Sequence, residues 1–117
     1  MDDNRARELL AAERQRVEQM LEESLEAARE DRDAVNEAVD VAEPSERFTA
    51  EQIDDALVER LRERLDAIER AEARLRAGTY GRSVRSGTPI PDERLEADPA
   101  AELTLDEAAG ARRWPSG

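Results

Sequence analysis

The sequence predicts a mainly α-helical chain, a long antiparallel coiled-coil hairpin followed by a small C-terminal head. Residues 5–39 contain neither glycine nor proline, and residues 50–77 repeat the same helical spacing of apolar side chains. Glycine and proline return from residue 78 onward. The chain has 117 residues, a length that fits one domain. Only 21 of the 117 residues are Leu, Ile, Val or Phe, a fraction typical of disordered proteins. Their regular spacing nevertheless indicates helices that pack against each other.

The first predicted helix covers residues 4–39 and the second covers residues 49–77. The large apolar residues of the first are Leu10, Val17, Leu21, Leu25, Val35 and Val39, mostly at steps of 4 and 7. Those of the second are Ile53, Leu57, Leu61, Leu65, Ile68 and Leu75. Leu61, Ile68 and Leu75 are seven residues apart, which is the spacing of a coiled-coil seam. Because each helix has one apolar stripe, neither is expected to be stable without the other.

The predicted connection, residues 40–48, forms the tip of the hairpin. It is short, so the two helices are expected to be antiparallel neighbours. Pro44 interrupts the helical pattern within it. Thr49 and Gln52 have the spacing of a capping box, which places the start of the second helix at Thr49. Gly78 follows the second helix as a C-terminal cap.

Residues 78–117 are expected to form the head and a C-terminal tail, which leaves residues 1–77 as the hairpin domain. Pro91 is suited to the start of a short helix over residues 92–97, and residues 105–113 could form another. The N-terminal end of the first helix is expected to complete the head. The candidate core residues are Ile90, Leu95, Leu103 and Leu105, with Tyr80 covering them.

The composition excludes several classes of function. The chain has no Cys, His or Lys, so it lacks thiolate and imidazole metal ligands, disulfides and Cys- or His-dependent catalysis. The net charge of −12 argues against a protein that binds DNA or RNA by neutralising phosphates. No apolar run approaches the ~20 residues of a membrane span, and the N-terminal sequence is unlike a signal peptide. A two-helix hairpin offers no enclosed pocket to shift carboxylate pKa values, so neither an enzyme nor a cofactor is expected.

Residues 78–107 resemble the zinc-finger segment of the DksA/TraR family of RNA polymerase-binding regulators. In that family a coiled-coil hairpin leads into a Gly-x-[Tyr/Phe]-Gly turn, a CxxC pair, Gly, Ile-Pro, Arg-Leu-x-Ala-x-Pro-x-Ala and a second CxxC pair. The matching residues here are Gly78, Tyr80, Gly81, Gly87, Ile90, Pro91, Arg94, Leu95, Ala97, Pro99 and Ala101. The four positions of the family cysteines hold Ser83, Ser86, Thr104 and Glu107. The resemblance therefore implies a zinc-finger-like head that has lost its metal site.

The resemblance also implies a bacterial, cytoplasmic regulator of transcription that is not an enzyme. Such a protein binds RNA polymerase by inserting the coiled-coil tip into the secondary channel, and a monomer is expected. In the family, acidic tip residues act near the catalytic centre, and ungapped counting places that motif on Asp40, Glu43 and Ser45. Two carboxylates three residues apart could face a magnesium ion or a basic loop of the polymerase. They could equally be ordinary solvated charges.

An alternative is a diverged structural or adaptor protein whose hairpin pairs with another helix or with itself, because the first helix has a weakly apolar, Ala-rich stripe. Binding of the alarmone ppGpp, which in some family members uses basic residues, is not expected, because the stretch around Ala67 and the residue Ala108 are not basic. The arginines of the second helix are interpreted mostly as a solvated face: Arg60, Arg62, Arg64, Arg70, Arg74 and Arg76.

Overall fold

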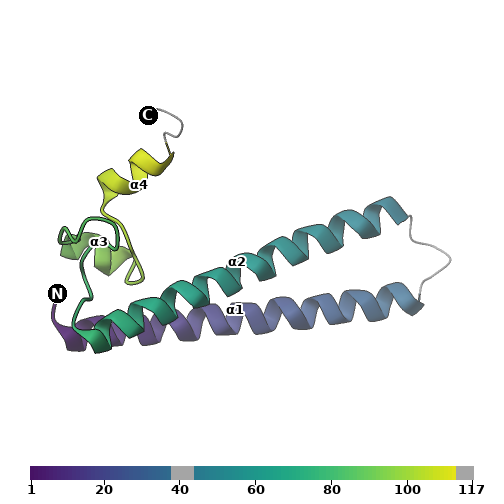
Figure 1. Cartoon of the computed structure of the whole chain (residues 1–117). Helices are drawn as coiled ribbons and strands as arrows, with labels where there is room; N and C mark the ends of the chain where they lie inside the picture. The colour runs from purple at the N-terminus through teal and green to yellow at the C-terminus, as the bar shows by residue number, and fades with distance from the viewer. Residues whose placement is uncertain (38–43, 113–117) are drawn as a thin grey trace. The chain divides into compact units, whose positions relative to one another are not determined.

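The computed structural model describes the backbone of residues 1–37 and 44–112 and the side chains of residues 1–30 and 55–110. Its helices are α1 (Asp3–Glu37), α2 (Pro44–Ala77), α3 (Asp92–Ala97) and α4 (Leu105–Arg112), as Figure 1 shows. No β-strand occurs in these ranges, and one isolated antiparallel bridge joins Arg82 and Pro89. The fold is therefore mainly helical with a helical hairpin, as the sequence predicts.

The start of α2 differs from the prediction. The capping-box pattern places it at Thr49, whereas α2 begins at Pro44. Proline is favoured at the first helical position because its missing N–H has no partner there and its fixed φ suits a helix. Pro44 thus begins the helix instead of interrupting it, and Thr49 lies inside α2. The bounds of α3 agree with the prediction, and α4 covers Leu105–Arg112 of the predicted residues 105–113, the last of which lies outside the described residues.

The chain divides into two compact units. The head unit comprises Met1–Arg14 and Asp66–Gly117, and the hairpin unit comprises Gln15–Leu65. The expected boundary at residues 77 and 78 is not where this division falls, because the first turns of α1 and the last turns of α2 belong with the C-terminal third.

The hairpin unit carries the middle of the predicted apolar stripes. Its buried members are Val17 and Leu61, and its partly buried members are Leu21, Leu25 and Leu65. Met20 and Leu57 are more open, with 37% and 40% of their surface exposed. The side chains of Val35, Val39 and Ile53 fall outside the described ranges.

The head unit has a core with two parts. The helices contribute the buried residues Ala6, Leu10, Ile68 and Ala71. The second part is a cluster of Ile90, Leu95 and Ala101, against which Met1 and Tyr80 pack. The predicted roles of Ile90, Leu95 and Tyr80 are therefore confirmed.

Leu105 is not part of the core, although the sequence suggested it. It is 65% exposed, whereas Thr104, Glu107 and Ala108 are partly buried. Residues three and four apart share one face of a helix, so the inward face of α4 carries polar and small side chains. Leu105 begins α4 on a different face, which explains its exposure. The predicted core residue Leu103 is partly buried.

A Schellman motif ends α2, as the position of Gly78 predicts. The Gly78 N–H donates to the Leu75 carbonyl at 3.3 Å, and the Thr79 N–H donates to the Arg74 carbonyl at 2.9 Å. Gly78 has a φ of 79°, which is the left-handed conformation that this motif requires. The motif turns the chain from α2 toward Tyr80 and the rest of the head.

Candidate functional site

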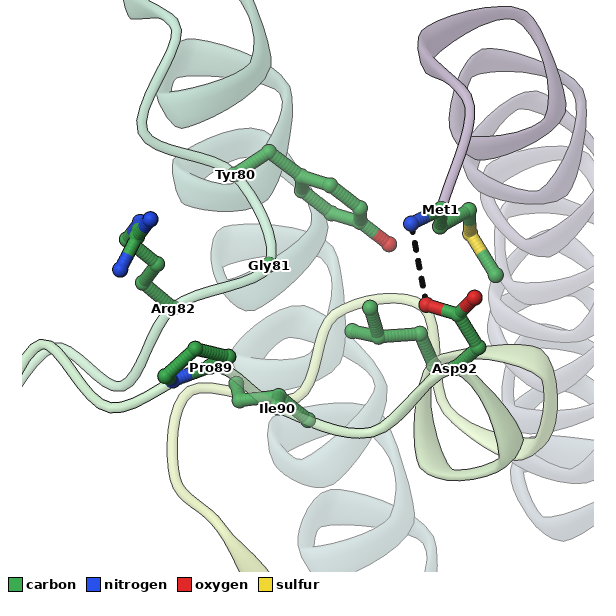
Figure 2. A pocket seen from close by; sticks show the side chains of 8 residues that line it. Met1, Tyr80, Gly81, Arg82, Pro89, Ile90 and Asp92 are labelled. Carbon is green, nitrogen blue, oxygen red and sulfur yellow. Dashed lines mark ion pairs between the residues drawn. The ribbon is translucent and has the colours of Figure 1, made fainter.

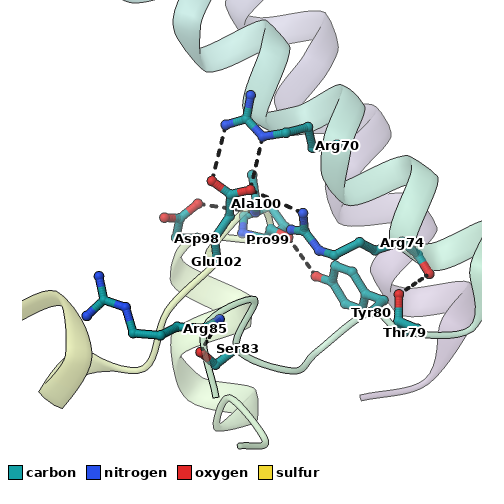
Figure 3. Close-up of polar contacts among 10 residues, drawn as sticks. All are labelled: Arg70, Arg74, Thr79, Tyr80, Ser83, Arg85, Asp98, Pro99, Ala100 and Glu102. Atoms are coloured by element: carbon teal, nitrogen blue, oxygen red, sulfur yellow. Dashed lines mark hydrogen bonds and ion pairs between the residues drawn. The ribbon is translucent and has the colours of Figure 1, made fainter. Parts of the chain in front are cut away.

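Ser83 and Ser86, the first pair of positions where the DksA/TraR family has cysteines, lie in a tight turn. Ser83 is 4% exposed, and its Oγ accepts hydrogen bonds from the N–H groups of Arg85 and Ser86 at 3.1 and 3.2 Å. Figure 3 shows the bond from Arg85. The Ser83 carbonyl accepts from the Gly87 N–H at 2.9 Å, and the Ser83 N–H donates to the Thr88 carbonyl at 2.8 Å. The Ser86 Oγ accepts from the Thr88 N–H at 3.2 Å and donates to Thr88 Oγ1 at 2.9 Å. The turn is therefore held by its own backbone and by the hydroxyls of Ser83 and Ser86.

The second pair, Thr104 and Glu107, forms a capping box at the start of α4. The Thr104 N–H donates to Glu107 Oε1 at 3.0 Å, and the Glu107 N–H donates to Thr104 Oγ1 at 3.2 Å. The Thr-x-x-Glu spacing that signals such a box is present in the sequence. These two residues are also two of the positions where the DksA/TraR family has cysteines, and the capping box that they form was not predicted.

The Glu107 carboxylate accepts the Thr104 N–H, and this backbone hydrogen bond is the main cause that lowers the pKa of Glu107 to about 2. The Val84 N–H donates to the Glu102 carbonyl at 2.9 Å, so the segment that contains Ser83 and Ser86 pairs with the segment just before Thr104.

The donor set at these four positions does not fit the structural zinc that the resemblance to the DksA/TraR family implies. Zinc prefers a closed tetrahedron of thiolate or imidazole ligands, whereas the four side chains offer three neutral hydroxyls and one carboxylate. Ser83 Oγ already accepts two backbone hydrogen bonds, which use its lone pairs. Among the residues with described side chains, no group of three or more His, Cys, Asp or Glu is arranged to hold a metal ion.

Arginine–glutamate contacts join the C-terminal part of the head to α1 and α2. Arg5 Nε and Nη2 donate to the Glu96 carboxylate at 3.1 and 2.8 Å. Arg70 Nε and Nη2 donate to the two oxygens of Glu102 at 3.0 and 3.1 Å, and Arg74 Nη1 donates to the same carboxylate at 3.2 Å (Figure 3). Hydrogen bonding by Arg70 is the main cause that lowers the pKa of Glu102. Arg70 pairs with Glu102 but remains 55% exposed, whereas Arg74 is 16% exposed and is therefore not part of a solvated face, which corrects that interpretation for Arg74.

A cavity of about 210 Å³ lies beside Tyr80 (Figure 2). It is lined by Met1, Tyr80, Gly81, Arg82, Pro89, Ile90, Asp92 and Leu95. The Met1 amino group is 3.0 Å from the Asp92 carboxylate at its edge. The Tyr80 hydroxyl donates to the Pro99 carbonyl at 2.8 Å, and burial is the main cause that raises the pKa of Tyr80 to about 12. These contacts hold Tyr80 over the head core and give it a structural role.

The predicted tip residues fall where the structure gives little or no description. Asp40 and Glu43 lie outside the described residues. Ser45 lies in the first turn of α2, and its side chain is not described. Their contact with a polymerase stays a prediction. Within the described ranges, no helix combines the length and the hydropathy needed to cross a membrane.

Comparisons with known proteins identify the fold. No family model matches the chain. A 48-residue stretch, 41% of this chain, is 44% identical to General stress protein 16O of Bacillus subtilis; this stretch spans only 29% of that protein's length. The structure is similar to that of transcription factor DksA2 from Pseudomonas aeruginosa, with a TM-score of 0.79 and 28% sequence identity over 95% of this chain and 83% of that one. The chain therefore has a DksA-like transcription-factor fold.

Proposed function

We propose that the chain is a DksA/TraR-type regulator that binds RNA polymerase in the bacterial cytoplasm and reaches the secondary channel with its hairpin. The observation that carries the proposal is the likeness to transcription factor DksA2, at a TM-score of 0.79 over 95% of the chain. The residues around Tyr80 and Ile90, which match the family motif, support it from the sequence. Such a regulator acts by binding and needs no catalytic group of its own.

In this proposal the tip supplies the residues that affect the polymerase. The tip motif of the DksA/TraR family is usually Asp-x-x-Asp-x-Ala. Asp40 and Glu43 keep the spacing of its acidic pair, and Ser45 stands where the motif has alanine. Carboxylates near a metal-containing active centre change the local electrostatic potential, so they alter the enzyme's chemistry without adding a reaction step. Binding should depend on other surfaces, since the two tip carboxylates are a small part of the chain.

The proposal is tested with purified core polymerase and three forms of the protein. The wild type should bind stoichiometrically at micromolar concentration and be displaced by another factor that occupies the secondary channel. The Asp40→Ala/Glu43→Ala variant should bind with similar affinity but lose the effect on transcription. The control is Asp55→Ala/Glu59→Ala, which removes the same charge from exposed positions of α2 and should behave as wild type. Absence of association, or binding that the competitor leaves unchanged, contradicts the proposal.

Exposed apolar side chains of the hairpin unit favour a second candidate, a coiled-coil adaptor that pairs with another helix or with itself. Met20 and Leu57 are 37% and 40% exposed, and Leu21 and Leu25 line a shallow groove. Sedimentation velocity separates the two functions. A dimer that forms with rising concentration and is lost in Leu57→Gln supports the adaptor, whereas a monomer over the whole range supports the polymerase-binding finger.

A further inference from the structure

A groove of about 290 Å³ lies in the head unit, between the first turns of α1 and the last turns of α2. It is lined by Arg7 and Leu10 of α1 and by Glu72, Leu75 and Arg76 of α2. The described C-terminal part of the head does not line it, and the proposed function gives it no role. The groove is therefore a surface whose occupant can be inferred from its own side chains.

The floor of this groove is aliphatic and its rim is basic. Leu10 is 1% exposed and Leu75 is partly buried, whereas Arg7 and Arg76 are exposed. Both leucines belong to the apolar stripes of the two helices, so helix packing fixes their positions. The described lining contains no aromatic ring on which a nucleotide base could stack. The floor thus suits an aliphatic side chain better than a base.

The charge that the groove can offer to a partner is positive. Glu72 already accepts two hydrogen bonds from Arg14, one of them from Nε at 3.2 Å, so its charge is paired. Arg7 Nη1 donates to the neutral side-chain amide of Asn4 at 3.0 Å. Although the chain has 30 acidic and 18 basic residues, neither Arg7 nor Arg76 forms an ion pair with a carboxylate among the described side chains. Two guanidinium groups therefore remain for an acidic partner.

We propose that this groove is a docking site for an acidic, amphipathic helical segment of a protein partner. A groove between two packed helices accepts such a helix through apolar side chains spaced three and four residues apart, here placed on Leu10 and Leu75. Carboxylates of the same segment pair with Arg7 and Arg76, because guanidinium groups donate paired hydrogen bonds to carboxylates and arginine is enriched at protein interfaces. The inference goes beyond polymerase binding and does not rest on it.

Titration of the ¹⁵N-labelled full chain, followed by nuclear magnetic resonance, tests the proposal. The probe is a peptide of about 15 residues, long enough to form a helix, with leucines three and four residues apart and a glutamate beside each leucine. The matched peptide has glutamine in place of every glutamate. The acidic peptide should shift the amide signals of residues 7–11 and 72–77 and bind at least about fivefold more tightly than the glutamine peptide at low salt. This difference should shrink as salt is added.

Two double variants assign the effect to the groove. Arg7→Gln/Arg76→Gln should bind the two peptides equally. The matched control, Arg60→Gln/Arg62→Gln, removes the same charge from exposed positions of the hairpin unit and should behave as wild type. All four arginines are exposed, so both variants should fold. Equal affinity of the wild type for the two peptides, failure of both to bind, or equal effects of the two double variants would overturn the proposal. Inorganic phosphate that shifts the same signals at lower concentration than the acidic peptide would also overturn it, because the groove would then be a site for a small anion.

Discussion

Replacing Glu102 tests how the C-terminal part of the head is held against α2. Its carboxylate accepts two hydrogen bonds from Arg70 and one from Arg74, so a single substitution removes the anionic partner of both arginines (Figure 3). Glu102→Gln keeps the size of the side chain. The variant should fold, with a lower free energy of unfolding for the head unit.

The expected loss follows from how exposed each partner is. A hydrogen bond to a charged group contributes roughly 1.5–3 kcal/mol, and exposed pairs contribute much less because solvent screens them. Arg70 is 55% exposed, so its two hydrogen bonds to Glu102 are expected to contribute less than this range. Arg74 is 16% exposed, so its hydrogen bond is screened less by solvent. Arg74 Nη2 is buried with no hydrogen-bond partner among the described residues, and loss of the Glu102 carboxylate also removes the hydrogen-bond partner of Nη1 from this largely buried guanidinium. We expect a total loss of about 2 kcal/mol for Glu102→Gln.

Urea unfolding monitored by circular dichroism measures this loss, with an unchanged m-value showing that the native fold is kept. Arg74→Gln should cost more than Arg70→Gln, and each should show coupling to Glu102→Gln in a double-mutant cycle. The matched control is Glu96→Gln, which breaks a similar two-bond contact with Arg5 where both side chains are about half exposed. Its effect should be clearly smaller.

The pH dependence of the free energy of unfolding is a second test of the contact of Glu102 with Arg70 and Arg74. The arginines lower the pKa of Glu102 below its ordinary value of 4.5, so the stabilisation is complete above pH 4.5 and is lost as the pH falls through the lowered pKa. The free energies of wild type and Glu102→Gln should therefore converge in acid, and also in high salt. A Glu102→Gln variant within about 0.5 kcal/mol of wild type at neutral pH would refute the reasoning.

Three further substitutions examine the rest of the head. Tyr80→Phe removes the hydrogen bond to the Pro99 carbonyl and should lower the free energy of unfolding in urea by about 1 kcal/mol. In the wild type, absorbance should show Tyr80 ionising near pH 12. The free energy of unfolding should fall as the pH rises from about 10 to about 12. Leu95→Ala empties a site that is 1% exposed and should cost roughly 2–5 kcal/mol, seen as loss of exchange protection in residues 81–107. Gly81→Ala places a Cβ at a φ of 85°, 3.7 Å from Leu95 Cδ1, and should cost about 1–2 kcal/mol by the same urea assay, mainly through backbone strain.

The sequence predicted the elements that depend on local signals. The hairpin helices follow from apolar spacing, the end of α2 follows from Gly78, and α3 follows Pro91. Each signal acts within a few residues, so it can be recognised without the tertiary structure. The predicted start of α2 at Thr49 was wrong. Pro44 and Thr49 both carry signals for the start of a helix, and no local signal distinguishes between them.

What the sequence could not supply are the contacts that depend on distant residues. Glu72 and Arg76 have the spacing of a pair within one helix, yet Glu72 binds Arg14, 58 positions away. Arg70 similarly contacts Glu102, 32 positions away. A carboxylate within reach of two arginines takes the partner that tertiary packing brings nearest, and one-dimensional spacing does not contain that information. The positions of Ser83, Ser86, Thr104 and Glu107 could be singled out from the sequence only because the family motif has cysteines there.

The absence of lysine has a structural counterpart in the head unit. At Arg5, Arg14 and Arg70, Nε and Nη2 donate to the two oxygens of one glutamate, a planar two-bond arrangement that an ammonium group cannot form. The triple variant with lysine at these positions keeps every charge, so a purely electrostatic contribution predicts an unchanged urea midpoint. We expect a lower midpoint, because the paired hydrogen bonds are lost. Lysine at Arg60, Arg62 and Arg76, three exposed arginines of α2, is the matched control and should leave the midpoint unchanged. Equal midpoints for the two triple variants would show that charge alone holds the head to the helices.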